Sequence, residues 1–287
     1  RPFGENCGFT LSEAAQFGIL MDDELALELG ANIYGSIADV FINADGFKKS
    51  IPGPGIGNYV TVGKALGVIR SMLGEDVVRN RTYMQAHGTG TPANRVTESH
   101  IFNELAKTFG INNWPIAAIK AYLGHSLATA AGDQLATTLG VWADGIIPGI
   151  RTVDQIAEDV HDSQVEFLLD HREIDPTTID ATFINSKGFG GNNATGAILS
   201  PTITRQMLEK KHGITAMTKH AKANETVQER TAQYNTETNE GKNNLIYNFG
   251  VGVVDGTELT LSDTEIQIPG LECSISLEVP NPYEDML

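Results

Sequence analysis

The chain has 287 residues, of which 41% are hydrophobic and 20% charged, so it can bury one large core or two smaller ones and is not a disordered chain. A formal net charge of −16 argues against a nucleic-acid partner, because phosphate binding depends on clustered Lys and Arg side chains. No apolar run approaches the ~20 residues that span a bilayer, and the first residues lack a signal-peptide core, so we expect neither membrane insertion nor secretion.

Only two cysteines occur, Cys7 and Cys273, and they lie far apart in unrelated contexts. Neither a disulfide framework nor a Cys-x-x-Cys metal motif can be written from them, which indicates a reducing, cytoplasmic location and no bound metal or other cofactor. The chain begins at Arg1, without a methionine, directly in a stretch whose residues already follow a structural pattern. We therefore expect it to be part of a longer protein.

Strand and helix patterns alternate over residues 1–200, which indicates an α/β domain. Gly30 and Gly74 mark two of the expected helix ends. We expect strands at residues 18–21, 32–40, 83–86, 116–119, 165–169, 181–185 and 195–199, and helices at residues 22–29, 60–73, 96–109 and 126–142.

From Pro201 the composition becomes polar and rich in Lys, Glu, Thr and Asn up to about Lys242. Apolar residues spaced among the lysines of 210–222 predict a partly amphipathic helix or helix pair. Two further runs, at residues 245–254 and 259–268, predict a hairpin around Asp255-Gly256-Thr257-Glu258. We therefore expect residues 201–287 to form a small helical and β-hairpin extension of the domain at 1–200.

Two histidine-containing segments follow predicted strands, where α/β sheets usually carry their chemistry. In His87-Gly88-Thr89-Gly90-Thr91-Pro92, the glycines permit tight turns and leave His87 at the end of the strand. His87 is then either a proton donor or acceptor or a structural residue. In Lys120-Ala121-Tyr122-Leu123-Gly124-His125-Ser126, His125 opens an Ala- and Thr-rich helix. The positive end of the helix dipole disfavours imidazolium, so a neutral His125 can donate one N–H to a developing oxyanion. The alternative is a helix-capping His125 with Lys120 as a solvated charge.

A third segment, Asn185-Ser186-Lys187-Gly188-Phe189-Gly190-Gly191-Asn192-Asn193, places three glycines around Phe189. Glycines let backbone N–H groups approach a ligand and let the aromatic ring swing, which predicts either a gate or an ordinary connection between strands. A phosphate cradle is disfavoured because neither Gly-x-Gly-x-x-Gly nor the P-loop spacing is present.

Together, the three segments resemble the C-terminal signature set of the elongating β-ketoacyl synthases, whose active sites combine one cysteine with two histidines. His87 is similar to the family's first catalytic histidine, and His125, in Leu-Gly-His-Ser-Leu-Ala-Thr-Ala-Ala-Gly, is similar to the second. Lys120 stands at the family's lysine position, and Phe189 lies in a segment that resembles the closing Asn-Ser-x-Gly-Phe-Gly-Gly-x-Asn loop. The resemblance extends over roughly residues 1–200, because 1–3 and 8–15 resemble the segment that follows the nucleophile.

The resemblance implies one half of a thiolase-like fold, a layered αβαβα structure that two similar halves build, usually in a homodimer. It implies an acyltransferase in which a cysteine of the other half takes up an acyl group and a malonyl thioester is condensed with it. The partners implied are acyl carrier protein and malonyl and acyl thioesters, including acyl-coenzyme A, in fatty-acid or polyketide synthesis.

The resemblance also implies roles for particular residues. His87 and His125 would stabilise the thioester oxygen as negative charge appears on it, and Lys120 would organise the second histidine electrostatically. Gly188, Phe189 and Gly190 would form the gate, and Thr89 and Thr91 are further substrate-binding candidates.

Two positions depart from the family pattern. Asn94-Arg95 stand where an acidic residue is common, which leaves Glu98 to pair with Lys120. Lys187 stands where a small or apolar residue is more common.

Other functions remain open. A non-catalytic partner subunit, like the chain-length factors that keep the ketosynthase fold without its cysteine, is disfavoured by the presence of both histidines. A degradative thiolase would need a Cys-x-Gly base near the C-terminus, and Cys273 is followed by Ser274-Ile275.

Cys7 makes a poor nucleophile, since it follows Glu5 and no helix start or cation lowers its pKa. The lysines at 210–222 either contact an acidic carrier protein or form a solvated helix face.

Overall fold

The computed structural model describes residues 1–5, 8–46, 55–242 and 248–286. The chain divides into two compact units, residues 1–229 and 230–287. Within the described residues, no helix is long and apolar enough to cross a bilayer. Cys7 lies outside the described residues, and Cys273 is exposed in the second unit.

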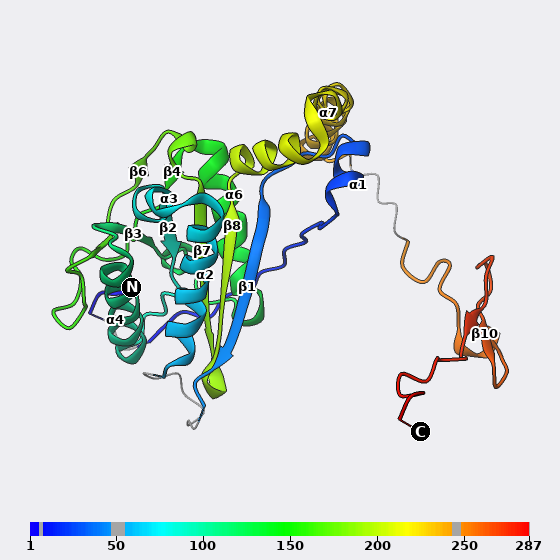
Figure 1. The fold of residues 1–287 in the computed structure, drawn as a ribbon, viewed down its shortest axis with the longest axis horizontal. Coiled ribbons are helices and arrows are strands. Elements are labelled where there is room, and N and C mark those ends of the chain that lie inside the picture. The colour runs from blue at the N-terminus through cyan, green and yellow to red at the C-terminus, as the bar shows by residue number, and fades with distance from the viewer. Residues whose placement is uncertain (6–7, 47–54, 243–247, 287) are drawn as a thin grey trace. The chain divides into compact units, whose positions relative to one another are not determined.

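A six-stranded mixed sheet organises the first unit, in the order β1-β8-β7-β2-β3-β5 (Figure 1). Its strands are β1 (Ser36–Ala44), β2 (Thr82–Gln85), β3 (Trp114–Ala117), β5 (Val165–Phe167), β7 (Ala181–Gly188) and β8 (Asn192–Leu199). β1 and β7 both pair antiparallel with β8, whereas β7, β2, β3 and β5 run parallel. The carboxyl ends of β7, β2 and β3 therefore lie at the same edge of the sheet.

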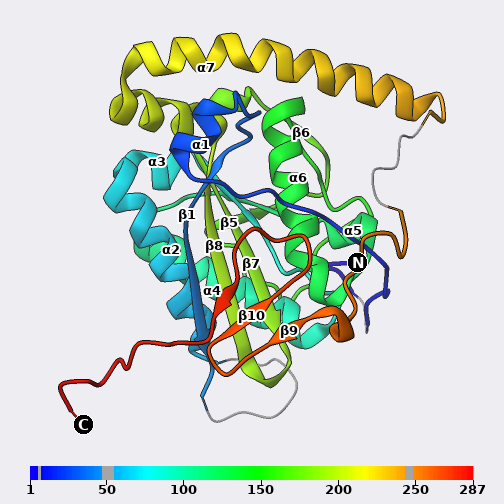
Figure 2. The same cartoon turned by 90° about the vertical axis from the view of Figure 1, so that its right-hand side faces the viewer.

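Helices cover both faces of this sheet. α2 (Gly57–Leu73), α3 (Glu75–Asn80) and α4 (Pro92–Phe109) belong to one side, and α6 (Ala130–Asp144) lies on the opposite face from α2 (Figure 2). The result is an αβα sandwich, which corresponds to one half of a thiolase-like fold and confirms the expected α/β class.

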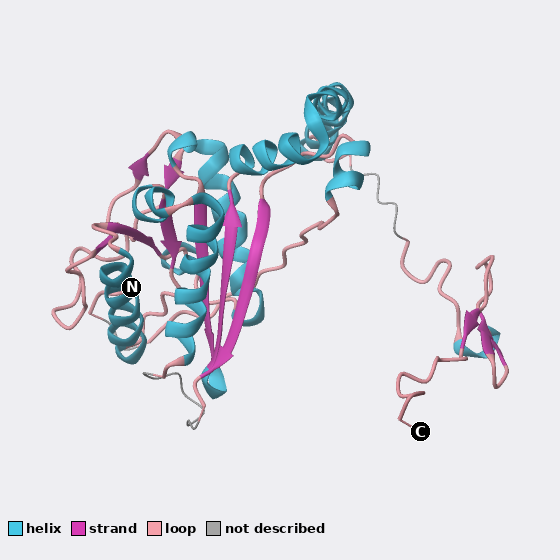
Figure 3. Cartoon of the chain, viewed as in Figure 1, coloured by secondary structure: helices cyan, strands magenta, loops and turns pink. Residues whose placement is uncertain are grey.

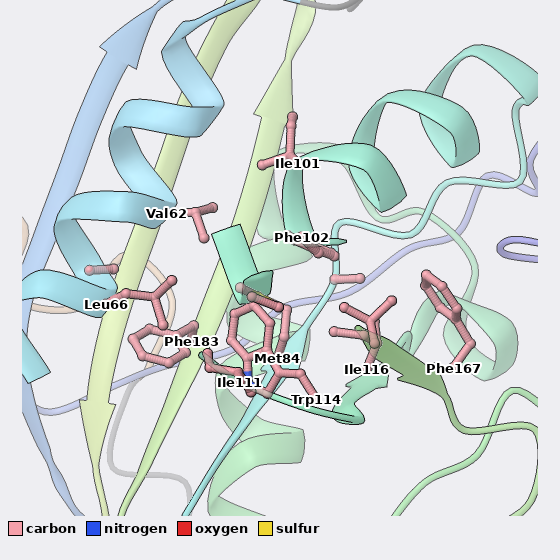
Figure 4. Packing of buried hydrophobic residues seen from close by; sticks show 14 of the residues in the cluster. Val62, Leu66, Met84, Ile101, Phe102, Ile111, Trp114, Ile116, Phe167 and Phe183 are labelled. Carbon is pink, nitrogen blue, oxygen red and sulfur yellow. The ribbon is translucent and has the colours of Figure 1, made fainter. Parts of the chain in front are cut away.

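The alternation of side chains along the strands explains the two cores. Met84 of β2 packs in a cluster with Leu66 of α2 and Phe102 of α4 (Figure 4). Its neighbour Tyr83 faces the other way and packs with Trp142 of α6. The strands at the centre of the sheet are buried on both faces, so their polar residues, such as Gln85, Thr182 and Asn185, are buried as well.

Shorter elements connect these layers (Figure 3). They are α1 (Asp23–Glu28), α5 (Lys120–Leu123), the 3-10 turns η1 (Leu127–Thr129), η2 (Pro176–Thr178) and η3 (Phe189–Gly191), and the antiparallel pair β4 (Ile146–Ile147) and β6 (Arg172–Glu173).

The long helix α7 (Pro201–Asn239) is kinked at Gly213, where φ is +82°. Its first part contacts the α1 region: Lys211 and His212 both bind Asp23. Further along, His220 Nε2 lies 2.9 Å from the carbonyl oxygen of Ala31. Gly213 is not helical and separates two helical segments, 201–212 and 214–239, which fits the expected helix or helix pair.

The second unit carries the 3-10 turn η4 (Gly256–Glu258) and a small antiparallel sheet of β9 (Thr260–Leu261), β10 (Glu265–Gln267) and β11 (Ile275–Ser276). The expected hairpin around residues 255–258 is wrong. Asp255 forms a capping box with Glu258, which holds these residues in a 3-10 turn. The reversal lies at Ser262–Thr264 instead, where the Ser262 hydroxyl accepts the Glu265 N–H at 2.9 Å. Residues 248–254 form no strand, and 245–247 lie outside the described residues.

Other predicted elements need correction in position. Residues 18–21 form no strand, and Ile19 is 84% exposed, because an apolar run cannot by itself supply a partner strand. β1 begins at Ser36 rather than at residue 32, and β3 begins at Trp114 rather than at residue 116. The expected helix at 126–142 begins as the 3-10 turn η1, and α6 starts only at Ala130. His125 therefore precedes a short turn rather than opening α6.

Candidate active site

Three adjacent parallel strands bring the expected site residues to one edge of the sheet. His87 lies two residues after β2, Lys120 three residues after β3, and Phe189 directly after β7. Since parallel strands end at the same edge, segments that are far apart in the sequence meet there. The fold itself thus assembles the candidate site.

The two histidines face each other. Their ring centroids lie 5.3 Å apart with an interplanar angle of 83°. His125 Nδ1 accepts the backbone N–H of Leu127 at 3.1 Å, so the neutral ring carries its proton on Nε2. The backbone of His125 is fixed by Thr10 and Ser12, through hydrogen bonds of 2.7 and 3.2 Å. An N-terminal segment thus holds the ring that donates from Nε2.

Burial keeps both imidazoles neutral. The pKa of His87 lies well below its ordinary value, chiefly because the ring is buried and also because Lys120, His125 and Lys187 lie near. Burial, together with the charge of Lys120, lowers the pKa of His125 to about 4, against an opposing effect of Asp133. At neutral pH each ring therefore keeps one N–H to donate.

Lys120 and Glu98 both fix the backbone of the His87 loop. The Lys120 ammonium donates to the His87 carbonyl oxygen at 2.6 Å, and burial lowers the pKa of Lys120 to about 8. Glu98 accepts four hydrogen bonds: from the N–H groups of His87 and Gly88 at 2.7 and 2.8 Å, and from the amides of Asn94 and Asn185 at 2.9 and 2.8 Å.

Glu98 and Lys120 make no direct ion pair among the described contacts, contrary to expectation. The negative charge of Glu98 still raises the pKa of Lys120. Glu98 belongs to the site chiefly as the acceptor that shapes the turn after His87.

The histidines line one cavity of about 670 Å³. Its wall also includes the other substrate-binding candidates, namely Thr89, Thr91, Gly188 and Phe189. The hydroxyls of Thr89 and Thr91 lie 3.2 Å apart. Phe189 is 70% exposed. Gly190 is not part of the lining but has φ of +79°, a conformation that glycine allows at the bend beside Phe189.

Two buried amides, Gln134 and Asn185, support the site in a role that the sequence did not reveal. Gln134 Nε2 lies within 3.1 Å of the carbonyl oxygens of Gln85, Ala86 and Asn185, which ties the end of β2 to β7. Asn185 exchanges two hydrogen bonds with Asn58 of α2. Asn185 opens the third segment noted in the sequence, whereas for Gln134 the signal is a polar residue among the apolar residues of α6.

Another residue that the sequence did not reveal is Asp133. Its carboxylate accepts hydrogen bonds from Gln16 and Ser126 beside His125. Within the described ranges, no group of three His, Cys, Asp or Glu side chains is arranged to hold a metal ion.

Comparisons with known proteins identify the family of this chain. The family model of the β-ketoacyl synthase C-terminal domain matches residues 34–154. The chain is 48% identical over its whole length to the β-ketoacyl-[acyl-carrier-protein] synthase FabY of Pseudomonas aeruginosa, of which it covers 45%. It is 30% identical over 200 residues, or 68% of its length, to 3-oxoacyl-[acyl-carrier-protein] synthase 2 of Synechocystis, of which it covers 45%.

Solved structures show the same relationship. The crystal structure of the noncanonical ketosynthase FabY from P. aeruginosa superposes with a TM-score of 0.88 over 100% of this chain and 45% of its own. The ishigamide ketosynthase/chain length factor superposes with a TM-score of 0.58 at 25% identity, over 70% of this chain and 46% of its own. The chain spans about half the length of the curated relatives it matches. It carries the C-terminal domain of the β-ketoacyl synthase family.

Proposed function

We propose that the complete protein is a β-ketoacyl synthase that condenses a malonyl thioester with an acyl group held on a cysteine. The observation that carries this proposal is the pair of neutral, inward-facing imidazoles, 5.3 Å apart, in one cavity. Two neutral N–H donors at one point suit an oxygen on which negative charge develops. The cysteine is expected in the part of the protein that corresponds to the other half of its relatives.

The reaction proceeds in two stages. In the first, the cysteine thiolate attacks the acyl thioester of a carrier protein or coenzyme A, the C–S bond of that thioester breaks, and the carrier leaves as a thiolate that takes a proton from water. In the second, the bond between the carboxyl carbon and C2 of the malonyl thioester breaks, carbon dioxide leaves, and the electron pair remains as an enolate. C2 then attacks the acyl carbonyl carbon, the C–S bond breaks, and the thiolate is restored.

His87 and His125 donate their N–H groups to the enolate oxygen in the second stage. His125 uses Nε2, since its Nδ1 is already occupied by the Leu127 N–H. Lys120 and Glu98 position His87 by fixing the turn on which it sits. Phe189, between glycines, opens and closes the cavity, and Thr89 and Thr91 contact the incoming thioester arm. Acyl carrier protein delivers the substrates to a homodimer.

The test uses the complete protein with malonyl-carrier protein and follows the release of carbon dioxide. His87→Ala and His125→Ala should each slow this release about 10²–10³-fold, because each removes one oxyanion donor. His161→Ala, at an exposed histidine outside the cavity, is the matched control and should stay within about twofold of the unchanged protein. Near-native rates in both cavity variants would defeat the proposal.

A non-catalytic partner subunit is the alternative. It predicts no decarboxylation by the complete protein on its own and no acyl-enzyme in its mass spectrum. A mass increase equal to one acyl group, lost on treatment with hydroxylamine, supports the enzyme instead.

A further inference from the structure

Lys187 is a buried cation at the wall of the candidate active site. It lies one residue before the end of β7, opposite Asn193 of β8, and only 6% of it is exposed. Because side chains alternate along a strand, Lys187 is on the same face of β7 as Asn185, which contacts Asn58 of α2. Lys187 lines the same cavity as His87, His125 and Phe189.

The cavity wall has an asymmetric charge. Among its described lining residues none is an aspartate or glutamate, whereas Lys187 contributes a cation and the two histidines contribute N–H donors. Glu98 and Asp133, whose charges act on Lys120, do not belong to this lining. The charge of Lys187 also reaches His87, where it helps to lower the pKa of that ring. A wall of this kind favours a ligand with an anionic group.

We propose that Lys187 binds the free carboxylate of the malonyl thioester and so selects malonyl over simple acyl thioesters at this stage. This inference rests on the proposed function. An acyl group has no carboxylate, so Lys187 distinguishes the two substrates by charge rather than by size. The ammonium forms a charge-assisted hydrogen bond with the carboxylate, which is stronger than a hydrogen bond between neutral groups.

The same placement predicts which kinetic constant changes. During decarboxylation, carbon dioxide leaves uncharged and the negative charge passes to the enolate oxygen at the histidines. The hydrogen bond from Lys187 to the carboxylate is therefore strongest in the bound substrate and weakens in the transition state. Its removal should raise KM and should not lower kcat.

The experiment compares two half-reactions of the complete protein. One is the decarboxylation of malonyl-carrier protein, and the other is loading of the cysteine by a saturated acyl thioester. Lys187→Met removes the charge but retains a long side chain, and Lys187→Arg retains the charge. Lys64→Met, at an exposed lysine of α2, is the matched control for loss of one surface charge.

Lys187→Met should raise KM for the malonyl thioester about 10–100-fold, the range expected for one hydrogen bond to a charged group, and should affect acyl loading much less. Lys187→Arg should keep most of the malonyl affinity, and Lys64→Met should match the unchanged protein. Lys187→Gln, measured in parallel with thermal unfolding of each variant, provides a second neutral side chain if the methionine variant fails to fold.

Two results would overturn the role of Lys187: a malonyl KM within twofold of the unchanged protein in the neutral variants, or equal losses in both half-reactions. If the unchanged complete protein neither decarboxylates malonyl thioester nor loads an acyl group, the proposed function fails instead. The two failures are therefore distinguishable.

Discussion

Replacing Glu98 by Gln is expected to destabilise the domain strongly although the two side chains have the same shape. Oε1 of Glu98 accepts N–H groups from His87 and Asn185, and Oε2 accepts them from Gly88 and Asn94. An amide keeps only one oxygen, so in either orientation its NH2 group faces two donors. Two hydrogen bonds to a charged group, each about 1.5–3 kcal/mol, are lost, which gives a loss of about 3–6 kcal/mol.

Urea unfolding followed by tryptophan fluorescence measures this loss, because Trp114 and Trp142 are both buried in the sandwich that contains Glu98. Glu75→Gln is the matched control: Glu75 is half exposed and pairs with Arg79 one helical turn away, a contact worth about 0.3–0.5 kcal/mol. A loss below about 1 kcal/mol for Glu98→Gln, or one no larger than that of Glu75→Gln, would refute the reasoning that Glu98 holds the His87 turn.

Further predictions concern the same loop and its neighbours. The His125 ring should titrate near pH 4 in a proton NMR titration, remain neutral as the pH falls through 6.5, and carry its proton on Nε2; a pKa near 6.5 would contradict its burial. Gly88→Ala should lower the free energy of unfolding by about 1–3 kcal/mol, because φ is +56° and a Cβ would lie 2.7 Å from that of Ala118. Gly67→Ala, in open space on α2, should instead raise it by about 0.5–1 kcal/mol, and equal effects of the two changes in urea unfolding would contradict both.

Local patterns predicted the elements that surround the candidate site. The glycines after the predicted strand at 83–86 placed His87 at a strand end, and β2 does end at Gln85. Parallel neighbours then bring the segments of His87, Lys120 and Phe189 to one edge. Local patterns do not show which residues form hydrogen bonds or ion pairs with one another. The sequence suggested an ion pair between Glu98 and Lys120. Glu98 instead accepts hydrogen bonds from four donors, which only the folded chain brings together.

Predictions failed where competing local chemistry or a missing partner decided the conformation. The Asp255 side chain caps a 3-10 turn and so displaces the expected hairpin reversal by several residues. The apolar residues near Ile19 suggested burial in a strand, yet a strand exists only if another pairs with it. Gln134 could not be identified because its role depends on carbonyl groups of two different strands, at the end of β2 and within β7.

The most direct test of the proposed chemistry is a double-mutant cycle on carbon dioxide release from malonyl-carrier protein, with His87→Ala, His125→Ala and the double variant of the complete protein. If both rings donate to the same enolate oxygen, the double variant should lose clearly less than the product of the two single losses, with a coupling of at least about 0.5 kcal/mol. Losses that simply multiply would mean that the two histidines act independently, and would contradict the shared oxyanion site.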